Sequence, residues 1–145
     1  MSGRNPSRRR RQCAALPISR QGGEVRVMLV TSRETRRWVL PKGWVEKRCT
    51  PAAQAAREAF EEAGIRGRIG KVPLGRYGYA KRLADGTCLP VEVEVYALEV
   101  ESLLDHWPEQ DERERRWFTP AEAAEAVQEG DLGSLLLSLA TPRAA

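Results

Sequence analysis

The stretch GWVEKRCTPAAQAAREAFEEAGI, Gly43 to Ile65, changes from a polar loop into a helical pattern within a few residues. Thr50 is a suitable N-cap because its hydroxyl can accept a hydrogen bond from a free helical N–H, and Pro51 fits the first helical position. Gly64 ends the pattern, as glycine commonly does just past a helix. The stretch therefore predicts a helix over residues 51–63.

Three glutamates of this helix fall on one face. At about 100° per residue, Glu58, Glu61 and Glu62 share an arc of about 100°. Glu58 and Glu62 repel each other unless a cation lies between them, and Arg57 is placed to pair with Glu61. Mg²⁺ prefers carboxylate oxygens, so this face is a candidate metal site, with a solvated acidic face as the alternative. The opposite side is expected to pack on a sheet, with Phe60 as its largest anchor: Ala52, Ala55, Ala56, Ala59, Phe60 and Ala63.

The same stretch resembles the signature of the Nudix hydrolases, G-x5-E-x7-R-E-U-x-E-E-x-G-U, in which U is a bulky apolar residue. Seven of the nine specified positions match: Gly43, Arg57, Glu58, Glu61, Glu62, Gly64 and Ile65. Ala59 is smaller than the apolar residue of the signature. Cys49 stands where the signature has its first glutamate, and Glu46 is a nearby candidate to substitute for part of that loss.

The resemblance implies a fold and an activity. The fold is α+β: the Nudix fold, a mixed β-sheet in an α/β/α sandwich. The implied reaction is hydrolysis of a pyrophosphate bond with Mg²⁺ as cofactor, Mn²⁺ being an alternative. A pyrophosphate is multiply anionic and repels hydroxide, so a metal ion is needed to neutralise it and to activate the attacking water.

Residue roles follow from the resemblance, position by position. The implied metal ligands are three carboxylates and one backbone carbonyl: Glu58, Glu61, Glu62 and Gly43. Three residues are implied as catalytic, with Arg57 orienting the glutamates and Glu58 also a candidate base: Arg57, Glu58 and Glu61. Glu112 and Glu114, in a later charged loop, are weaker candidates for the base.

A wider resemblance links the chain to one branch of the family. The segments RRQCAALP, VMLVTSRETRRWVLPKG and RERRWFTPAEA are similar to diphosphoinositol polyphosphate phosphohydrolases, which also cleave dinucleoside polyphosphates. The branch implies phosphate contacts at a serine and four arginines: Arg11, Ser32, Arg33, Arg113 and Arg115. The chain has PKGW where the branch has PGGG, which adds Lys42 as a charge and Trp44 as a ring that a nucleotide base can stack on. The substrate is therefore open between a diadenosine polyphosphate and a diphosphoinositol polyphosphate.

The remaining pattern predicts a mixed sheet with helices on both faces. Strands are expected over 13–18, over 25–32, over 36–44 with a break at Pro41, and over 115–118. The segment 77–100 predicts a hairpin around Asp85 and Gly86. Two further helices are expected, one from the N-cap Thr119 to its end at Gly130 and a short apolar one over 132–140.

Length and composition indicate one globular domain. The chain has 145 residues, of which 41% are hydrophobic and 30% charged. We expect a disordered basic tail over residues 1–10 and a single Nudix domain over 11–145. No apolar run approaches the roughly 20 residues of a membrane span, and the basic N-terminus precedes no segment of signal-peptide type. The expected location is therefore cytoplasmic.

Other classes of function are disfavoured. The three cysteines are widely spaced, which argues against a disulfide framework, and the single histidine, His106, argues against histidine-pair sites. The expected partner is a phosphorylated small molecule; nucleic acid and membrane are not expected, and a monomer or a homodimer are both open. Two alternatives remain: a catalytically weak sensor module that keeps the fold, for which Cys49 is the main support, and an RNA 5′-end pyrophosphohydrolase, for which the arginine run Arg8 to Arg11 is the support.

Overall fold

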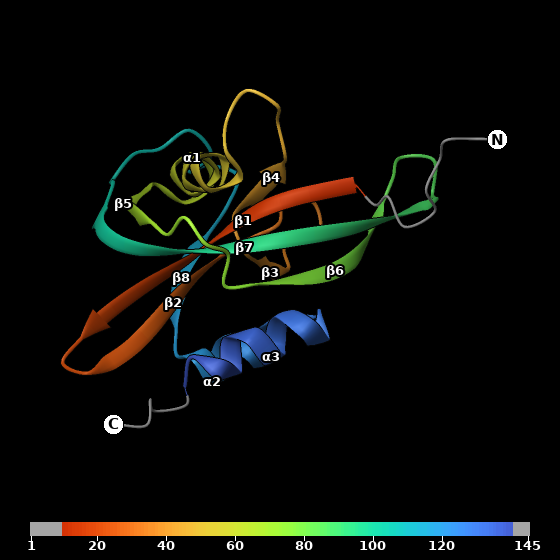
Figure 1. Ribbon diagram of the computed structural model, residues 1–145. Helices are drawn as coiled ribbons and strands as arrows, with labels where there is room; N and C mark the ends of the chain where they lie inside the picture. The colour runs from red at the N-terminus through yellow and green to blue at the C-terminus, as the bar shows by residue number, and fades with distance from the viewer. Residues whose placement is uncertain (1–9, 141–145) are drawn as a thin grey trace.

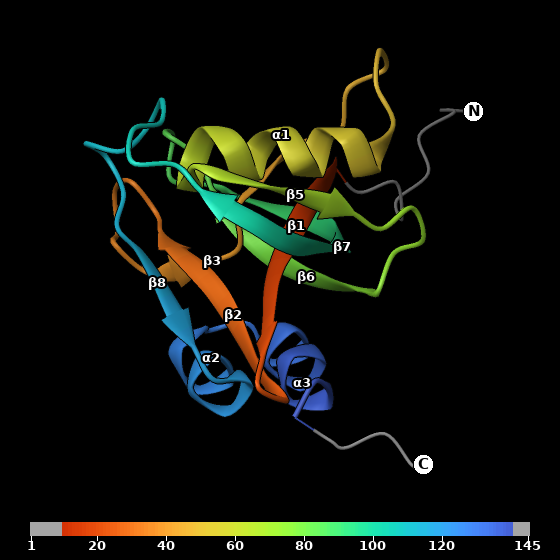
Figure 2. The ribbon, with the colours of Figure 1, turned by 90° about the vertical axis from the view of Figure 1, so that its left-hand side faces the viewer.

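A mixed sheet of eight strands forms the middle layer of the computed structural model, which describes residues 10–140 (Figure 1). Helix α1 (Pro51–Ala63) covers one face of the sheet, and helices α2 (Pro120–Ala126) and α3 (Gly130–Ser138) cover the other (Figure 2). This arrangement confirms the expected α+β sandwich. Within the described residues, no helix has the length and apolar character needed to cross a bilayer.

The strands run in the order β3-β2-β1-β7-β5, with β4 added to β1, β6 to β7 and β8 to β2. At the centre β1 and β7 pair in parallel, and the other pairings of the described residues are antiparallel. The bounds are β1 Arg10–Gln21, β2 Glu24–Thr31, β3 Trp38–Val39, β4 Lys42–Trp44, β5 Ile65–Ile69, β6 Gly75–Arg82, β7 Cys88–Leu103 and β8 Arg115–Phe118.

Helix α1 has the predicted bounds because both of its ends are encoded locally. The Thr50 hydroxyl accepts a hydrogen bond from the Ala53 N–H at 3.1 Å, and Pro51 begins the helix. Gly64 adopts the left-handed conformation with φ 64°, and its N–H closes the last turn on the Phe60 carbonyl. The helix that carries the glutamates is therefore fixed at both ends by its own sequence.

Several sequence-based predictions of elements and their ends differ from the structure. Strand β5 follows α1 directly and was not predicted. Gly130 begins α3 and does not end α2, which stops at Ala126. Strand β1 begins at Arg10, the last residue of the expected tail, while the rest of that tail lies outside the described residues.

The two faces of the sheet have different cores. On the α2–α3 face large aliphatic side chains fill the space, among them the fully buried Leu132 and Leu136. On the α1 face alanines meet the sheet: Ala52, Ala55, Ala59 and Ala63. Phe60, expected as the anchor of α1, is only half-buried and lies outside that core, under the guanidinium of Arg66 at 5.2 Å. The small alanines, and not a large ring, hold α1 against the sheet.

Candidate active site

The three signature glutamates share one face of α1 but differ in burial. Glu62 is the most buried, with 6% of its surface exposed, while Glu58 and Glu61 are half-buried. Burial, and next the Glu58 carboxylate, raise the pKa of Glu61 above its usual value. The helix thus presents acidic groups that range from half-exposed to nearly enclosed.

The backbone at Gly43 lies directly against the Glu58 carboxylate. Strand β4 pairs with β1 so that Gly43 stands opposite Cys13, beside the start of α1. A Cβ atom built at Gly43 would overlap the carboxylate of Glu58. A side chain at this position would push the Glu58 carboxylate aside, so the signature glycine lets the backbone of β4 lie against a signature glutamate.

Burial dominates the ionisation of Glu62. Burial raises the pKa of this carboxyl, the Arg113 guanidinium lowers it and Glu58 raises it, and the combined effect moves the pKa from 4.5 to about 8. The terminal Nη2 of Arg113 lies 3.8 Å from Glu62 Oε2. A cation bound at this face would favour the charged form of Glu62, as Arg113 does in part.

Lys42 lies on the strand next to the signature glycine. Burial lowers the pKa of its amine to about 8, and the negative charges of Glu62 and Glu129 act against that shift. The Nζ atom lies 5.2 Å from the centre of the Tyr79 ring. The predicted substrate residue Lys42 is thus linked electrostatically to the signature glutamate Glu62, which supports its assignment to the same site.

Arg57 does not pair with Glu61 as the helix geometry suggested. Its Nη2 atom forms an ion pair with Glu46 of the preceding loop and donates to the Gln54 side-chain oxygen at 2.8 Å. Arg57 therefore ties the loop to the first half of α1. Glu46, the suggested partial substitute for the missing glutamate, does contact the signature arginine.

Two arginines that were predicted to bind phosphate are engaged inside the fold. Arg113, with 10% of its side chain exposed, donates to Glu109 Oε1 at 2.7 Å and to the Thr31 carbonyl at 3.0 Å. Arg115 donates to the carbonyls of Ala63 and Leu104, both at 2.8 Å.

The surroundings of Arg113 and Arg115 indicate that both side chains stabilise the fold. The guanidinium of Arg115 also stacks on the Trp107 ring at 3.9 Å, and burial lowers its pKa. Arg115 therefore closes the C-terminal end of α1, and Arg113 holds the buried Glu62. Both guanidinium groups have partners within the protein in this arrangement, and their assignment to substrate phosphates stays a prediction.

The other predicted substrate residues lie nearer the surface. Arg11 keeps 53% of its side chain exposed and lies 3.8 Å from Glu94, and Arg33 keeps 58% and pairs with Glu112 at 3.2 Å. Trp44 is 37% exposed on β4.

Ser32 and the two acids of the later loop have partners. The Ser32 hydroxyl accepts from the Arg37 N–H at 3.0 Å and so shapes the turn after β2. Glu112 is paired with Arg33, and Glu114 lies 4.0 Å from Arg36. These pairings give no support for either glutamate as the base.

Residues missed by the sequence analysis complete the surroundings of the glutamates. Gln54, 2% exposed, donates from its side-chain amide to Glu58 Oε2 at 2.6 Å. Gln54 lies one helical turn before Glu58, so the helical periodicity of the sequence already indicated that the two side chains are neighbours. Glu109 and Trp107 come from a distant loop: the Glu109 N–H donates to the Glu61 carbonyl at 3.0 Å, and the Trp107 indole donates to the Glu62 carbonyl at 3.1 Å. No local pattern pointed to those contacts.

The donor set suits a hard divalent cation. Carboxylates and a backbone carbonyl are the groups that Mg²⁺ binds, and the close approach of Gly43 to Glu58 leaves the strand backbone beside the acids. In the part of the chain from residue 10 to residue 140, the side chains do not gather into a cluster of three or more acidic, cysteine or histidine groups around one point. Mg²⁺ is usually held by one or two carboxylates together with waters, so binding at this face does not need three such side chains around one point.

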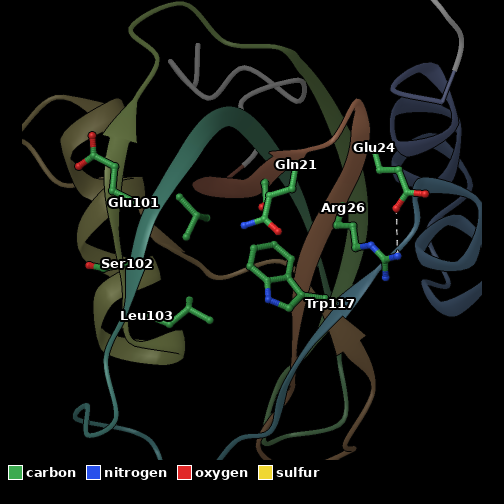
Figure 3. A pocket seen from close by; sticks show the side chains of 9 residues that line it. Gln21, Glu24, Arg26, Glu101, Ser102, Leu103 and Trp117 are labelled. Atoms are coloured by element: carbon green, nitrogen blue, oxygen red, sulfur yellow. Dashed lines mark hydrogen bonds and ion pairs between the residues drawn. The ribbon is translucent and has the colours of Figure 1, made fainter.

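A hollow of about 500 Å³ lies elsewhere, between the β1–β2 hairpin and the end of β7 (Figure 3). Its lining contains none of the predicted site residues: Ser19, Gln21, Glu24, Arg26, Val100, Glu101, Ser102, Leu103 and Trp117. Within it, Arg26 pairs with Glu24 at 3.3 Å. The hollow is separate from the glutamate face.

Comparison of the sequence with known proteins identifies a family. The NUDIX domain family matches residues 8–136. Nudix hydrolase 13, mitochondrial, of Arabidopsis thaliana is 38% identical over 107 residues, which are 70% of this chain and 53% of that protein. Diphosphoinositol polyphosphate phosphohydrolase 3-beta of Bos taurus is 34% identical over 118 residues, covering 79% of this chain and 68% of that protein.

The fold agrees with these matches. A solved C. elegans Ap4A hydrolase in a binary complex superposes with a TM-score of 0.66 at 20% identity, covering 90% of this chain and 95% of that one. The chain spans about half the length of the plant relative, whose name places it in mitochondria, so the cytoplasmic location stays a prediction. The sequence matches show that the chain belongs to the Nudix family.

Proposed function

We propose that the protein hydrolyses a pyrophosphate bond in a phosphate-rich small molecule with Mg²⁺ as cofactor. The observation that carries the proposal is the signature face of α1, which carries Glu58, Glu61 and Glu62 and where the Gly43 backbone lies against Glu58. Glu58, Glu61, Glu62 and the Gly43 carbonyl would hold the ion, with Mn²⁺ as an alternative. When bound, such an ion neutralises phosphate charge and lowers the pKa of a coordinated water.

Other steps of the proposed reaction are assigned to individual side chains around the acidic face. Glu58 is the proposed base, and Arg57 orients it through the contacts of its own helix turn. Arg113 holds the buried Glu62 in place, with its guanidinium 3.8 Å away. Lys42 supplies a positive charge beside the acids, where a substrate phosphate would approach.

The proposed substrate is a diadenosine polyphosphate or a diphosphoinositol polyphosphate. The exposed cations Arg11 and Arg33, together with Lys42, offer donors for several phosphates. The names of two relatives point to these two substrates, a diphosphoinositol polyphosphate phosphohydrolase and an Ap4A hydrolase. Trp44, 37% exposed on the strand of Gly43, would stack on a nucleotide base but would serve an inositol ring less well.

A panel of substrates tests the proposal. The full chain is incubated with Mg²⁺ and, separately, with diadenosine tetraphosphate, a diphosphoinositol polyphosphate, ADP-ribose and a 5′-triphosphate RNA, and products are separated by anion exchange. Glu62→Gln removes one proposed ligand, and Glu101→Gln, at an exposed glutamate outside the site, is the matched control. We expect cleavage by the wild type and by Glu101→Gln, and a loss of about 1,000-fold or more in Glu62→Gln. Cleavage by Glu62→Gln at the wild-type rate would contradict the site.

A second function has one observation in its favour. Cys49 occupies the position of a signature glutamate. A sensor that binds the substrate without cleaving it would show a raised melting temperature with one member of the panel and no product. That result would replace the hydrolase proposal.

A further inference from the structure

Gln54 is a buried polar side chain on the alanine-rich face of α1. It is 2% exposed, and its neighbours along the helix, Ala52 and Ala55, belong to the core between α1 and the sheet. A buried amide is costly unless its groups are hydrogen-bonded. The side-chain oxygen accepts from Cys49 Sγ at 3.1 Å and from Arg57 Nη2 at 2.8 Å, and the nitrogen donates to Glu58 Oε2 at 2.6 Å.

The chemistry of the neighbours fixes which way this amide points. A guanidinium only donates hydrogen bonds, and an ionised carboxylate only accepts them. The oxygen of Gln54 must therefore face Arg57, and its nitrogen must face Glu58. The reversed amide would place two donors against each other at Arg57 and two acceptors against each other at Glu58. Gln54 thus joins the signature arginine to the signature glutamate that follows it.

The same side chain lies where the signature is incomplete. Cys49 removes a carboxylate from the surroundings of Arg57, because the signature has a glutamate at this position. Arg57 has two acceptors in this structure, the carboxylate of Glu46 and the amide oxygen of Gln54. Glu46 supplies a negative charge, and Gln54 supplies an acceptor that also reaches Cys49 itself.

We infer that Gln54 is a positioning residue that compensates for Cys49: its oxygen anchors Arg57 together with Glu46, and its nitrogen holds the Glu58 carboxylate in the orientation needed to bind metal. The inference rests on the proposed function, because it assigns Gln54 to a glutamate proposed as a ligand. Gln54 itself contacts neither metal nor substrate in this assignment. Groups that orient metal ligands change metal affinity or activity by about 10- to 100-fold when they are removed.

The test is Gln54→Met, which keeps the length of the side chain and removes both of its hydrogen-bonding groups. Binding of Mn²⁺ alone to the full chain is measured by electron paramagnetic resonance, and thermal unfolding in EDTA reports on the fold. We expect about 10- to 100-fold weaker Mn²⁺ binding, and a fall in kcat with KM near the wild-type value. Gln21→Met, at an exposed glutamine outside the site, is the matched control and should bind as the wild type does.

A second substitution separates compensation from simple packing. Cys49→Glu in the Gln54→Met background returns a carboxylate to the signature position, so it should recover most of the lost affinity. Cys49→Glu alone should gain little, because Gln54 already supplies the acceptor. Equal Mn²⁺ affinity in Gln54→Met and in the double variant would overturn the inference, as would wild-type affinity in Gln54→Met. Loss of packing at Gln54 would not be repaired by a charge at position 49.

Three further outcomes also decide the inference. If Gln54→Met does not fold, Gln54→Glu keeps the acceptor for Arg57 and places a second carboxylate against Glu58; weakened Mn²⁺ binding supports the inference and unchanged binding overturns it. If Mn²⁺ binds the wild type and not Glu62→Gln, but binds Gln54→Met normally, only the assignment of Gln54 fails. If the wild type binds no Mn²⁺, the metal-dependent function fails and the inference fails with it.

Discussion

The two faces of the sheet are packed by opposite means. Against α1 the sheet meets alanines, so the helix backbone comes close and the acidic side chains of its outer face are placed by the backbone. Against α2 and α3 it meets leucines, which fill volume and carry no polar group. The comparison suggests that stability is concentrated on the α2–α3 face and precise placement on the α1 face.

The largest effect on stability should come from the α2–α3 face. Leu136→Ala removes a fully buried side chain, and we expect the free energy of unfolding to fall by about 2–5 kcal/mol. Leu137→Ala, next to it but 50% exposed, is the control and should change stability by less than about 0.5 kcal/mol. Chemical denaturation measures both. Equal losses in the two variants, or a selective loss of kcat in folded Leu136→Ala, would break the comparison.

Gly43→Ala tests whether the α1 face depends on precise placement of its acidic side chains. The new Cβ would overlap the Glu58 carboxylate, and a displacement of that size at a reacting group costs about 100-fold in kcat/KM. The melting temperature should change little, because Gly43 lies at the edge of the fold on the short strand β4. Gly130→Ala is the matched control, since a Cβ there meets nothing within 4 Å. A Gly43→Ala enzyme as active as the control would show that this close approach is unimportant.

The pH dependence of stability gives a third test on the α1 face. The pKa of Glu62 rises from 4.5 to about 8 on folding, so between these values the folded chain holds a proton that the unfolded chain has released. Stability without metal should therefore fall as the pH rises from about 4.5 to about 8. Glu62→Gln removes this slope and should be about 1–3 kcal/mol more stable than the wild type at pH 8 in EDTA.

Thermal unfolding at several pH values measures that difference. Added Mg²⁺ should reverse it, because metal binding favours the charged carboxylate and releases its proton. A Glu62→Gln variant that is less stable than the wild type at pH 8 would mean that the ion pair with Arg113 outweighs burial.

The smallest effect expected is a difference in thiol labelling. Burial raises the pKa of Cys13 in the α1-face core to about 12, so this thiol should stay unreactive in the native protein, while the exposed Cys88 reacts first. Mass spectrometry after timed alkylation gives the order. In Leu136→Ala, Cys13 should remain protected if the two faces open independently. Faster labelling of Cys13 in that variant would show that they open together.

Local signals in the sequence were sufficient for α1 and insufficient for its surroundings. Thr50, Pro51 and Gly64 set the ends of the helix through contacts within a few residues, which is why its bounds were predictable. Strand β5 could not be predicted in this way, because it is formed by pairing with β7, a partner far along the chain. At Gly67 the two strands come so close that a Cβ atom would overlap the backbone of Glu99.

The arginines show the same limit in the site. A sequence reveals that Arg113 and Arg115 are cationic and near each other, and the family resemblance assigned them to phosphate. Their acceptors in the structure include the carbonyls of Thr31, Ala63 and Leu104, which come from separate parts of the chain. Only the fold shows that both guanidinium groups form hydrogen bonds within the protein.

The parallel pairing of β1 with β7 has a consequence for how the protein is made. It joins residues roughly 80 positions apart, from the pair Arg10 and Val91 to the pair Ile18 and Glu99. During synthesis the signature loop and α1 leave the ribosome before β7 has been made. Until then, α1 lacks one of the central strands against which its alanines pack. Assembly of the site should therefore coincide with the slow, long-range step of folding, and a refolding assay should recover metal binding no earlier than the sheet.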